Sequence, residues 1–166
     1  LAHHDAKQYH EAIECYDQAL QLRPGYPAVL FAKGNAFRQL KEFERALKTY
    51  NEVIRYAPRV ALVHNNKGNV YTQLKKHTEA LECYDRAIEL APDFAGAYFN
   101  RGNNLYQLSF YEKAIESFER TIELQPKFVK AYVNKGNACF SLQRYEEAVE
   151  CANRAIELDP SDSFAH

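Results

Sequence analysis

An interval of 34 positions organises the sequence of this chain. Prolines and glycines mark it most clearly. The prolines at this spacing are Pro24, Pro58, Pro92, Pro126 and Pro160. The glycines at the same spacing are Gly34, Gly68, Gly102 and Gly136. Self-similarity at a fixed period of this length indicates a repeat array, in which each unit buries its apolar face by stacking on its neighbours.

Two more columns of residues follow the same period. One holds small residues: Ala12, Ala46, Ala80, Ala114 and Ala148. The other holds aromatic residues: Tyr16, Tyr50, Tyr84 and Phe118. We therefore predict a single array over residues 1–166. Its full repeats cover 27–60, 61–94, 95–128 and 129–162, while 1–26 close an earlier repeat and 163–166 open a later one.

Each repeat has the pattern of two helices. Apolar residues lie four positions before, three after and six after the glycine, which places them on one helical face. The second half, such as TEALECYDRAIELAP at 78–92, is rich in helix-forming residues and closes with proline. Strand signals are absent, so we predict an all-α fold.

A glycine inside a helix costs about 1 kcal/mol, and we expect it to permit a close helix contact, with Gly68 next to Ala80.

The columns of glycine, alanine, aromatic residue and proline at this interval resemble the tetratricopeptide repeat. The resemblance covers nearly the whole chain and includes NKGNACFSLQRYEEAVECANRAIELDP at 134–160. It implies a right-handed α-solenoid of stacked antiparallel helix pairs. The last repeat departs from the pattern, because Ala152 stands where other repeats carry Tyr or Phe and Cys139 replaces an aromatic residue. Both departures predict looser packing near the C-terminal end.

An asparagine follows each repeating glycine, as in HNNKGNVY at 64–71. At about 100° per residue, it shares a helical stripe with residues two and three positions before it and four and five after it. In the arrays that the chain resembles, the first helix of each pair lines the concave groove, which places this stripe in the groove. The candidate groove residues are Phe31, Asn35, Asn65, Asn66, Asn69, Phe99, Asn100, Asn103, Tyr106, Lys130, Asn134, Asn137 and Phe140.

Asparagine offers both hydrogen-bond donors and acceptors, so a row of asparagines can bind the backbone of an extended peptide. The aromatic residues of the stripe would supply apolar pockets between the amides. Similar ladders occur in the repeat arm of the O-linked N-acetylglucosamine transferase, where the groove holds protein substrates. We therefore predict a non-catalytic scaffold whose partner is a protein or peptide. The alternative is that the asparagines only bond neighbouring helices.

Chaperone adaptors with similar repeats grip a terminal carboxylate with a set of five polar and basic residues. The best register of this chain offers Asn69, Asn100 and Lys130 for that set. However, Asn65 and Asn134 stand where cations are required. Because a desolvated carboxylate needs those charges, binding of a chaperone tail is not favoured.

A basic residue precedes each repeating glycine, and helical-wheel geometry directs it away from the asparagine stripe. The members of this column are Lys33, Lys67, Arg101 and Lys135. We expect their stems to pack along a helix edge with solvated charged groups. The chain has a formal net charge of −1, so no nucleic-acid partner is predicted. No apolar run approaches the roughly 18 residues needed to cross a bilayer, so no membrane insertion is predicted.

The cysteines and histidines do not form a catalytic or metal-binding pattern. Cys15, Cys83 and Cys151 occupy a column of small residues, and no CxxC spacing exists. Among the cysteines, only Cys139 and Cys151 are expected to come close. Free thiols favour a reducing compartment, so we predict a cytoplasmic protein. The histidines near the N-terminus, His3, His4 and His10, do not justify a metal site, and no cofactor is predicted.

Two other functions remain open from the sequence. The chain begins inside the repeat pattern and contains no methionine, which suggests an excerpt of a longer protein. The array could therefore assemble with itself through apolar surfaces at its ends. It could also be the targeting arm of an enzyme whose catalytic domain lies outside residues 1–166.

Overall fold

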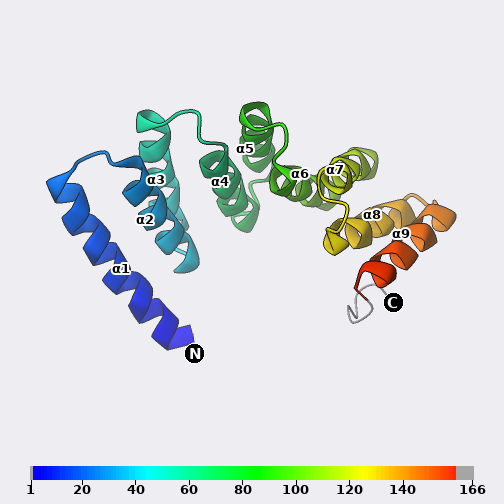
Figure 1. Cartoon of the computed structure of the whole chain (residues 1–166), viewed down its shortest axis with the longest axis horizontal. Coiled ribbons are helices and arrows are strands. Elements are labelled where there is room, and N and C mark those ends of the chain that lie inside the picture. The colour runs from blue at the N-terminus through cyan, green and yellow to red at the C-terminus, as the bar shows by residue number, and fades with distance from the viewer. Residues whose placement is uncertain (1, 160–166) are drawn as a thin grey trace. The chain divides into compact units, whose positions relative to one another are not determined.

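The computed structural model describes the backbone of residues 2–159 and the side chains from residue 6 to residue 159. The chain divides into two compact units, residues 1–90 and 91–166. The helices of the first unit are α1 (Ala2–Leu22), α2 (Pro27–Gln39), α3 (Phe43–Tyr56), α4 (Ala61–Gln73) and α5 (His77–Leu90) (Figure 1). Those of the second unit are α6 (Ala95–Gln107), α7 (Tyr111–Leu124), α8 (Val129–Ser141) and α9 (Tyr145–Leu158).

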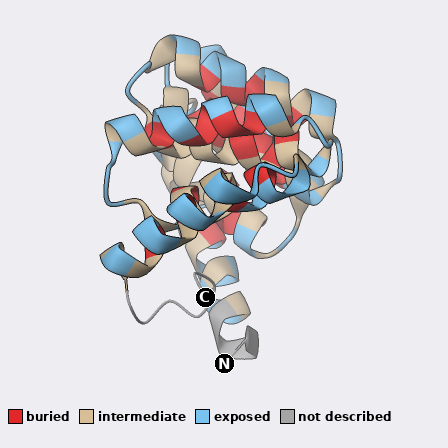
Figure 2. Cartoon of the chain, turned by 90° about the vertical axis from the view of Figure 1, so that its right-hand side faces the viewer, coloured by how far each residue is buried: buried red, intermediate tan, exposed pale blue. Residues whose placement is uncertain are grey.

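Every regular element in the described part of the chain is an α-helix, which confirms the predicted all-α fold. In the first unit α2 packs on α3 and α4 on α5, and α3 also contacts α4. In the second unit α6 packs on α7 and α8 on α9, while α7 contacts α8. Figure 2 shows the buried residues on the sides of the helices that face other helices. The first helices of successive repeats, α2 with α4 and α6 with α8, also lie next to each other.

The first helix of the chain is longer than the repeat pattern requires. By the period of 34, the turn that ends one helix at Lys41 should recur at Lys7, but α1 continues through that position. The second helix of a repeat normally folds back on the first one. Continuing the helix satisfies the backbone hydrogen bonds of this segment locally.

The turns between the two helices of each full repeat share one backbone conformation. The residues with positive φ are Lys41, Lys75, Ser109 and Gln143, at φ 59°, 58°, 62° and 61°. In each turn the next amide donates to a carbonyl five residues back, as Lys76 N does to Tyr71 O at 2.9 Å. This is the bond of a Schellman motif, which normally places glycine at the left-handed position. The chain uses other residues there, at a steric cost of about 1 kcal/mol each.

Replacing Lys75 by glycine is therefore expected to raise the free energy of unfolding by about 0.5–1 kcal/mol. Glycine adopts positive φ without the steric cost of a Cβ atom, and Lys75 is exposed. Urea denaturation followed by circular dichroism measures the change. Lys75→Ala is the matched control, because it removes the same side chain but keeps Cβ, and it should leave stability nearly unchanged. Equal effects of the two substitutions would contradict the backbone explanation.

The aromatic and alanine columns form the centre of the repeats. Ala46, Ala80 and Ala114 are completely buried, as are the rings of Tyr50 and Phe118. Tyr84 is 1% exposed. The repeated small and large residues thus alternate in the space between the two helices of each pair, which is the packing that a stacked helical array requires.

The repeating glycines contact these rings rather than the alanines. A Cβ atom added at Gly68 would lie 2.6 Å from Cε1 of Tyr84, and one at Gly102 would lie 2.6 Å from Cε1 of Phe118. The prediction of a close helix contact is confirmed, and the atoms nearest to Gly68 belong to the ring of Tyr84. The aromatic ring sixteen residues after the glycine reaches across the helix pair. Its atoms are therefore the ones nearest to the glycine.

The last repeat differs, because Ala152 removes the ring. A Cβ atom at Gly136 would meet the carbonyl oxygen of Ala148 and Cβ of Cys151, both at 3.3 Å. Here the alanine twelve residues later is the neighbour, as predicted for the other repeats. The expected looser packing is found beside Ala152, where a pocket opens. It is not found at Cys139, which is completely buried in a cluster with Ile115 and Ala138.

Candidate peptide-binding face

In the first unit, the asparagine stripe lies on α2 and α4 and is held by hydrogen bonds between its members. Asn35 Oδ1 accepts the hydroxyl of Tyr50 at 2.7 Å and the Nδ2 of Asn66 at 2.9 Å. The first bond fixes the amide to the second helix of its own repeat. The second bond joins it to the first helix of the next repeat, so Asn35 connects three helices.

The other amides of this unit follow a similar arrangement. Asn69 Oδ1 accepts the hydroxyl of Tyr84 at 2.9 Å, and that hydroxyl also lies 3.0 Å from Thr72 Oγ1. Asn65 is buried and donates from Nδ2 to Asn66 Oδ1 at 3.3 Å. The side chain of Asn65 therefore contributes to the interior rather than to an open surface.

In the second unit, the same bond recurs between first helices. Asn134 Nδ2 donates to Asn103 Oδ1 at 2.6 Å, across the same 31 positions that separate Asn66 from Asn35. Asn100 is half-buried, whereas Lys130 and Asn137 are exposed. The asparagines thus do bond neighbouring helices, as the structural alternative predicted, and this bonding orients the amides that remain accessible.

These bonds change the chemistry that the stripe offers to a ligand. An amide oxygen has two acceptor sites and an amide nitrogen has two donor hydrogens. Both acceptor sites of Asn35 are used by Tyr50 and Asn66, while its Nδ2 makes no hydrogen bond within the described residues. The remaining hydrogen-bonding capacity of this side chain is therefore that of a donor.

The tyrosine hydroxyls that hold the asparagines remain donors over a wide pH range. Burial raises the pKa of Tyr84 to about 12, and burial also raises the pKa of Tyr50. The phenolate form, which could only accept a hydrogen bond, is therefore excluded at neutral pH. Sequence reasoning placed Tyr50 and Tyr84 in the core column but missed this polar role. The signal was the spacing of fifteen positions between each asparagine and its tyrosine.

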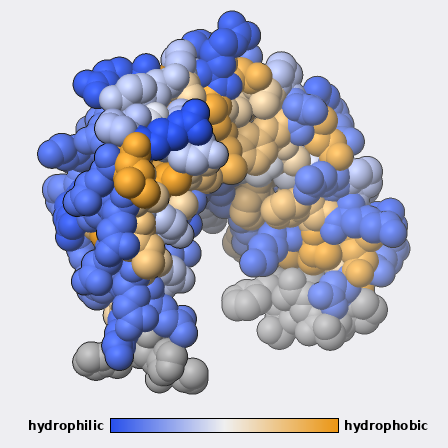
Figure 3. Space-filling view, turned by 60° about the vertical axis from the view of Figure 1, so that its left-hand side comes forward, coloured by the Kyte–Doolittle hydropathy of each residue, from blue (hydrophilic) through white to orange (hydrophobic). Residues whose placement is uncertain are grey.

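The aromatic members of the stripe divide into two groups. Phe31 and Phe99 are half-buried and pack on second-helix rings, with centroid distances of 6.1 Å to Tyr50 and 6.0 Å to Phe118. Tyr106 is also half-buried, against Tyr111. Phe140 is 64% exposed. Figure 3 shows that hydrophobic side chains reach the surface in patches bordered by hydrophilic ones. Of the four predicted pocket residues, Phe140 is the most open to a ligand.

One cation lies among the amides of the first unit. Arg38 continues the stripe on α2 and lies close to the hydroxyl of Tyr50. Its Nε is buried and has no hydrogen-bond partner among the described residues. An unsatisfied buried donor costs roughly 1–3 kcal/mol, so the burial of this atom is a local cost to stability.

The basic column lies off this face, as predicted, but most of its charged groups are not simply solvated. Lys33 pairs with Asp17, Lys135 Nζ lies 2.7 Å from Glu119, and the two lysine side chains are each 19% exposed. Arg101, the third of these residues, donates a hydrogen bond from Nη1 to Ser117 Oγ at 2.8 Å. The expectation of solvated charged groups was therefore wrong for these three residues. A neighbouring second helix supplies a polar partner at the place where each stem ends.

The thiols are unpaired and mostly inaccessible. Cys83, Cys139 and Cys151 are buried and Cys15 is exposed, and all four are free. Burial raises the pKa of Cys83 to about 11 and that of Cys151 to about 11. Because the thiolate is the reactive form, these thiols are inert near neutral pH.

Iodoacetamide at pH 7.5 is therefore expected to add one carbamidomethyl group rapidly, at Cys15. A pKa of about 11 leaves well under 1% thiolate at this pH, so Cys83 and Cys151 should react at least a hundredfold more slowly. Their rates should rise as pH increases toward the pKa. Mass spectrometry of timed samples measures both rates, and urea-unfolded protein, which should take four groups, is the control. Equal rates for Cys15 and Cys83 in the folded protein would contradict the expectation.

No group of three or more metal-ligating side chains that could hold an ion occurs in the part of the chain that the structure describes. The side chains of His3 and His4 lie outside that part. His64 is buried, and its Nε2 lies 3.3 Å from the carbonyl oxygen of Pro58, so it belongs to the core. Among the described helices, none is long and apolar enough to cross a membrane.

Comparison with known sequences identifies the family. Models of the tetratricopeptide repeat match residues 3–70, residues 61–94 and 129–162, and residues 95–128. The chain belongs to the tetratricopeptide repeat family. The matches at 61–94, 95–128 and 129–162 each cover 34 residues, which is the period of the sequence columns. A comparison with curated proteins gives no match.

Solved structures share this fold. MamA from Desulfovibrio magneticus RS-1 is 23% identical, with a TM-score of 0.84 over 96% of this chain and 97% of that chain. YrrB, described as a TPR protein with an unusual peptide-binding site, is 23% identical, with a TM-score of 0.80 over 96% and 82% of the two chains. The first TPR of Spaghetti (RPAP3), bound to the HSP90 peptide SRMEEVD, is 32% identical, with a TM-score of 0.63 over 64% of this chain and 84% of that chain.

Proposed function

We propose that this chain is a non-catalytic scaffold that binds an extended peptide or protein segment on the face formed by its first helices. The observation that carries the proposal is a repeated hydrogen bond between asparagine side chains. Asn66 donates to Asn35, and Asn134 donates to Asn103. It holds the side chains of successive first helices in one orientation. An oriented row of donors suits a ligand whose acceptors also recur at a fixed interval, and a peptide backbone has that property.

The arrangement favours contacts with peptide carbonyl groups. Asn35 has only donor hydrogens left, because both acceptor sites of its Oδ1 are used. Peptides of about six to ten residues are long enough to cross two adjacent helices spaced about 10 Å apart. YrrB, described as having an unusual peptide-binding site, and the RPAP3 domain bound to an HSP90 peptide support a peptide as the ligand class.

A free terminal carboxylate is not part of the proposal. The two positions that a carboxylate-binding set fills with cations hold Asn65 and Asn134, and both amides already donate to neighbouring asparagines. A neutral amide compensates a desolvated carboxylate poorly. SRMEEVD is therefore expected to bind no better than the same peptide with an amidated C-terminus.

The test is a peptide array followed by fluorescence anisotropy on the purified chain. The face variant is Asn69→Ala with Asn137→Ala. Loss of the Asn69 amide still leaves the hydroxyl of Tyr84 beside Thr72 Oγ1, and Asn137 is exposed, so both substitutions should preserve the fold. The matched control is Asn51→Ala with Asn153→Ala, which removes two exposed amides from the second helices α3 and α9.

The face variant is expected to weaken peptide binding at least tenfold, because each lost hydrogen bond contributes about 1 kcal/mol. The control variant should bind as the parent does. Equal affinities of the parent and the face variant would overturn the role of the amides. If no peptide in the array bound the parent, the proposed function itself would be wrong.

A further inference from the structure

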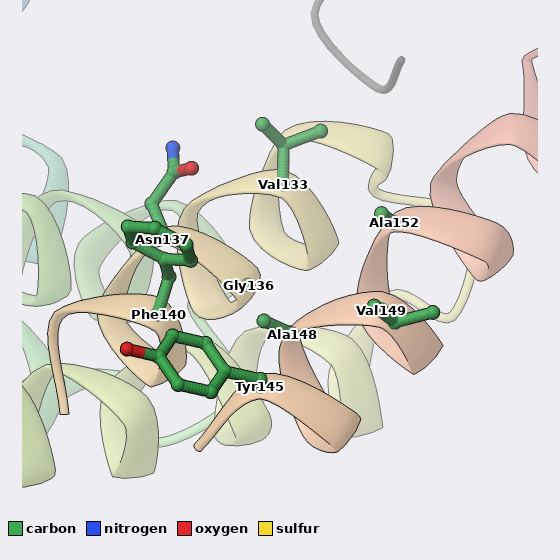
Figure 4. Close-up of a pocket in the computed structure, with 8 residues that line it drawn as sticks. All are labelled: Val133, Gly136, Asn137, Phe140, Tyr145, Ala148, Val149 and Ala152. Atoms are coloured by element: carbon green, nitrogen blue, oxygen red, sulfur yellow. The ribbon is translucent and has the colours of Figure 1, made fainter. Parts of the chain in front are cut away.

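Two pockets in the described part of the chain differ in their chemistry. The pocket beside Ala152, which Figure 4 shows between α8 and α9, is lined by no charged residue. A broader and more open pocket of about 620 Å³ lies on α3 and α4. Because α2 packs on α3 and α5 on α4, this second pocket lies within the first unit. Its polar lining residues are Glu44, Lys48, Asn51, Glu52, Arg55 and Tyr71.

Two cations of this pocket stand where other repeats carry glutamate. Lys48 and Arg55 are exposed and seven positions apart, so they lie on one side of α3 about 10 Å from each other. The residues at the position of Lys48 in the other repeats are Glu14, Glu82, Glu116 and Glu150. Those at the position of Arg55 in the later repeats are Glu89, Glu123 and Glu157. The charge at both positions is thus reversed in this repeat.

The two cations are not neutralised by ion pairs. In a later repeat, Arg86 Nη1 lies 2.7 Å from Glu89 Oε2, three residues further along the same helix. Lys48 and Arg55 form no ion pair with any described residue, although Glu52 lies between them on α3 and also lines the pocket. Both cations are therefore available to an anionic ligand.

A third cation borders the pocket. Lys67 Nζ lies 5.7 Å from the centroid of the Tyr71 ring, which lines the pocket. In the same sequence column, Lys135 pairs with Glu119, sixteen positions earlier. The residue sixteen positions before Lys67 is Asn51. Since an amide replaces the acid at this place, the charge of Lys67 is also uncompensated within the described residues.

The excess of positive charge extends over the whole repeat. Residues 27–60 contain seven lysines and arginines and three glutamates, whereas residues 129–162 contain four basic and six acidic residues. The formal net charge of −1 for the chain therefore combines regions of opposite sign. A local positive excess attracts anionic partners over about 10 Å at 0.1 M salt.

From these charge reversals, we infer that the pocket on α3 and α4 binds an acidic segment of a partner protein, whose carboxylates pair with Lys48, Arg55 and Lys67. Charged nitrogen donors and carboxylates form strong hydrogen bonds. Glu44 and Glu52 in the same pocket repel a continuous row of phosphates, so separate carboxylates of a peptide fit better than a nucleic-acid backbone. The amide face takes no part, so the inference is independent of the proposed function.

The test measures the fluorescence anisotropy of a labelled peptide of four Glu-Gly-Ser triplets with the full chain at about 50 mM NaCl. Three residues of an extended peptide span about 10 Å, which matches the spacing of Lys48 and Arg55. Peptides with glutamine or lysine in place of glutamate are expected to bind at least tenfold more weakly. The affinity for the glutamate peptide should also fall at least tenfold at about 0.5 M NaCl.

The key variant is Lys48→Glu with Arg55→Glu. Because other repeats carry glutamate at both positions, the fold should be preserved, and the melting temperature checks this. The variant should weaken binding at least tenfold, since two attractive contacts become repulsive. Asn51→Asp gives Lys67 an acidic neighbour and should weaken binding at least threefold. Asn51→Ala adds no charge and should bind as the parent does.

The matched control is Lys113→Glu with Lys127→Glu, which changes the net charge by the same amount. Both residues are exposed in the second unit, at positions that hold acidic residues in other repeats. This control should bind the glutamate peptide as the parent does. The Asn69→Ala and Asn137→Ala variant of the amide face should also bind it normally, which separates the two surfaces.

The inference would be overturned if the glutamate peptide did not bind, or if the glutamine peptide bound equally well. Equal losses in the key variant and the control would also overturn it, because binding would then follow net charge alone. A single-stranded oligonucleotide that bound more tightly than the peptide and lost affinity in the key variant would replace the acidic protein segment by nucleic acid.

Discussion

Replacing Tyr84 by alanine is expected to lower the free energy of unfolding by about 3–5 kcal/mol. The ring is 1% exposed and fills the space over Gly68. Its hydroxyl also donates to Asn69 Oδ1. The substitution therefore removes a buried ring, leaves a cavity and breaks a link between the core and the amide face. Urea denaturation followed by circular dichroism measures the loss.

Tyr145→Ala is the matched control for this experiment. Tyr145 is an aromatic residue at the start of a second helix, but about half of its surface is exposed. Its main loss is the edge-to-face contact with Phe140, which is worth about 1 kcal/mol. Similar losses for the two variants would show that the aromatic column does not carry the packing of the repeats.

Gly68→Ala should lower the free energy of unfolding in the parent chain and raise it in the Tyr84→Ala variant. In the parent, the new Cβ would lie 2.6 Å from a ring that is sealed in the core, so overpacking costs about 1–3 kcal/mol. The higher helix propensity of alanine offsets roughly 1 kcal/mol of that cost. In the Tyr84→Ala background the ring is absent, and Gly68→Ala should raise the free energy of unfolding by up to about 1 kcal/mol.

The difference between the two backgrounds is a coupling energy of about 2 kcal/mol, which a double-mutant cycle measures directly. Gly136→Ala provides a natural comparison, because its nearest neighbours lie at 3.3 Å and no ring is present. Gly136→Ala should change the free energy of unfolding by no more than about 1 kcal/mol in either direction. Additive effects of the Gly68 and Tyr84 substitutions would contradict a steric role for the glycine.

The periodic pattern contained enough information to predict the all-α fold and the family. A glycine, a proline and an aromatic residue at a fixed interval restrict each repeat to one arrangement of two helices, since every column has to serve the same packing position. A departure from a column also indicates a change in packing, because every residue of a column serves the same packing position. Ala152 indicated loose packing because its column holds rings elsewhere, and the pocket lies beside it.

The candidate site was only partly predictable. Helical periodicity placed the asparagines on one stripe, but periodicity carries no information about which side-chain atoms are already bonded. The hydroxyls of Tyr50 and Tyr84 come from the other helix of each pair, and their bonds to Asn35 and Asn69 depend on the distance between the helices. The burial of Asn65 and the half-burial of Phe31 depend on neighbouring helices in the same way.

The sequence alone determined which residues recur, which of them are helical and which family they belong to, because these properties depend on short-range order along the chain. Tertiary structure decided which neighbour each glycine meets, which amide atoms remain available and where a missing ring leaves a pocket. Those properties depend on contacts between helices, where a shift of 1 Å separates a hydrogen bond from an open donor and a filled core from a binding site.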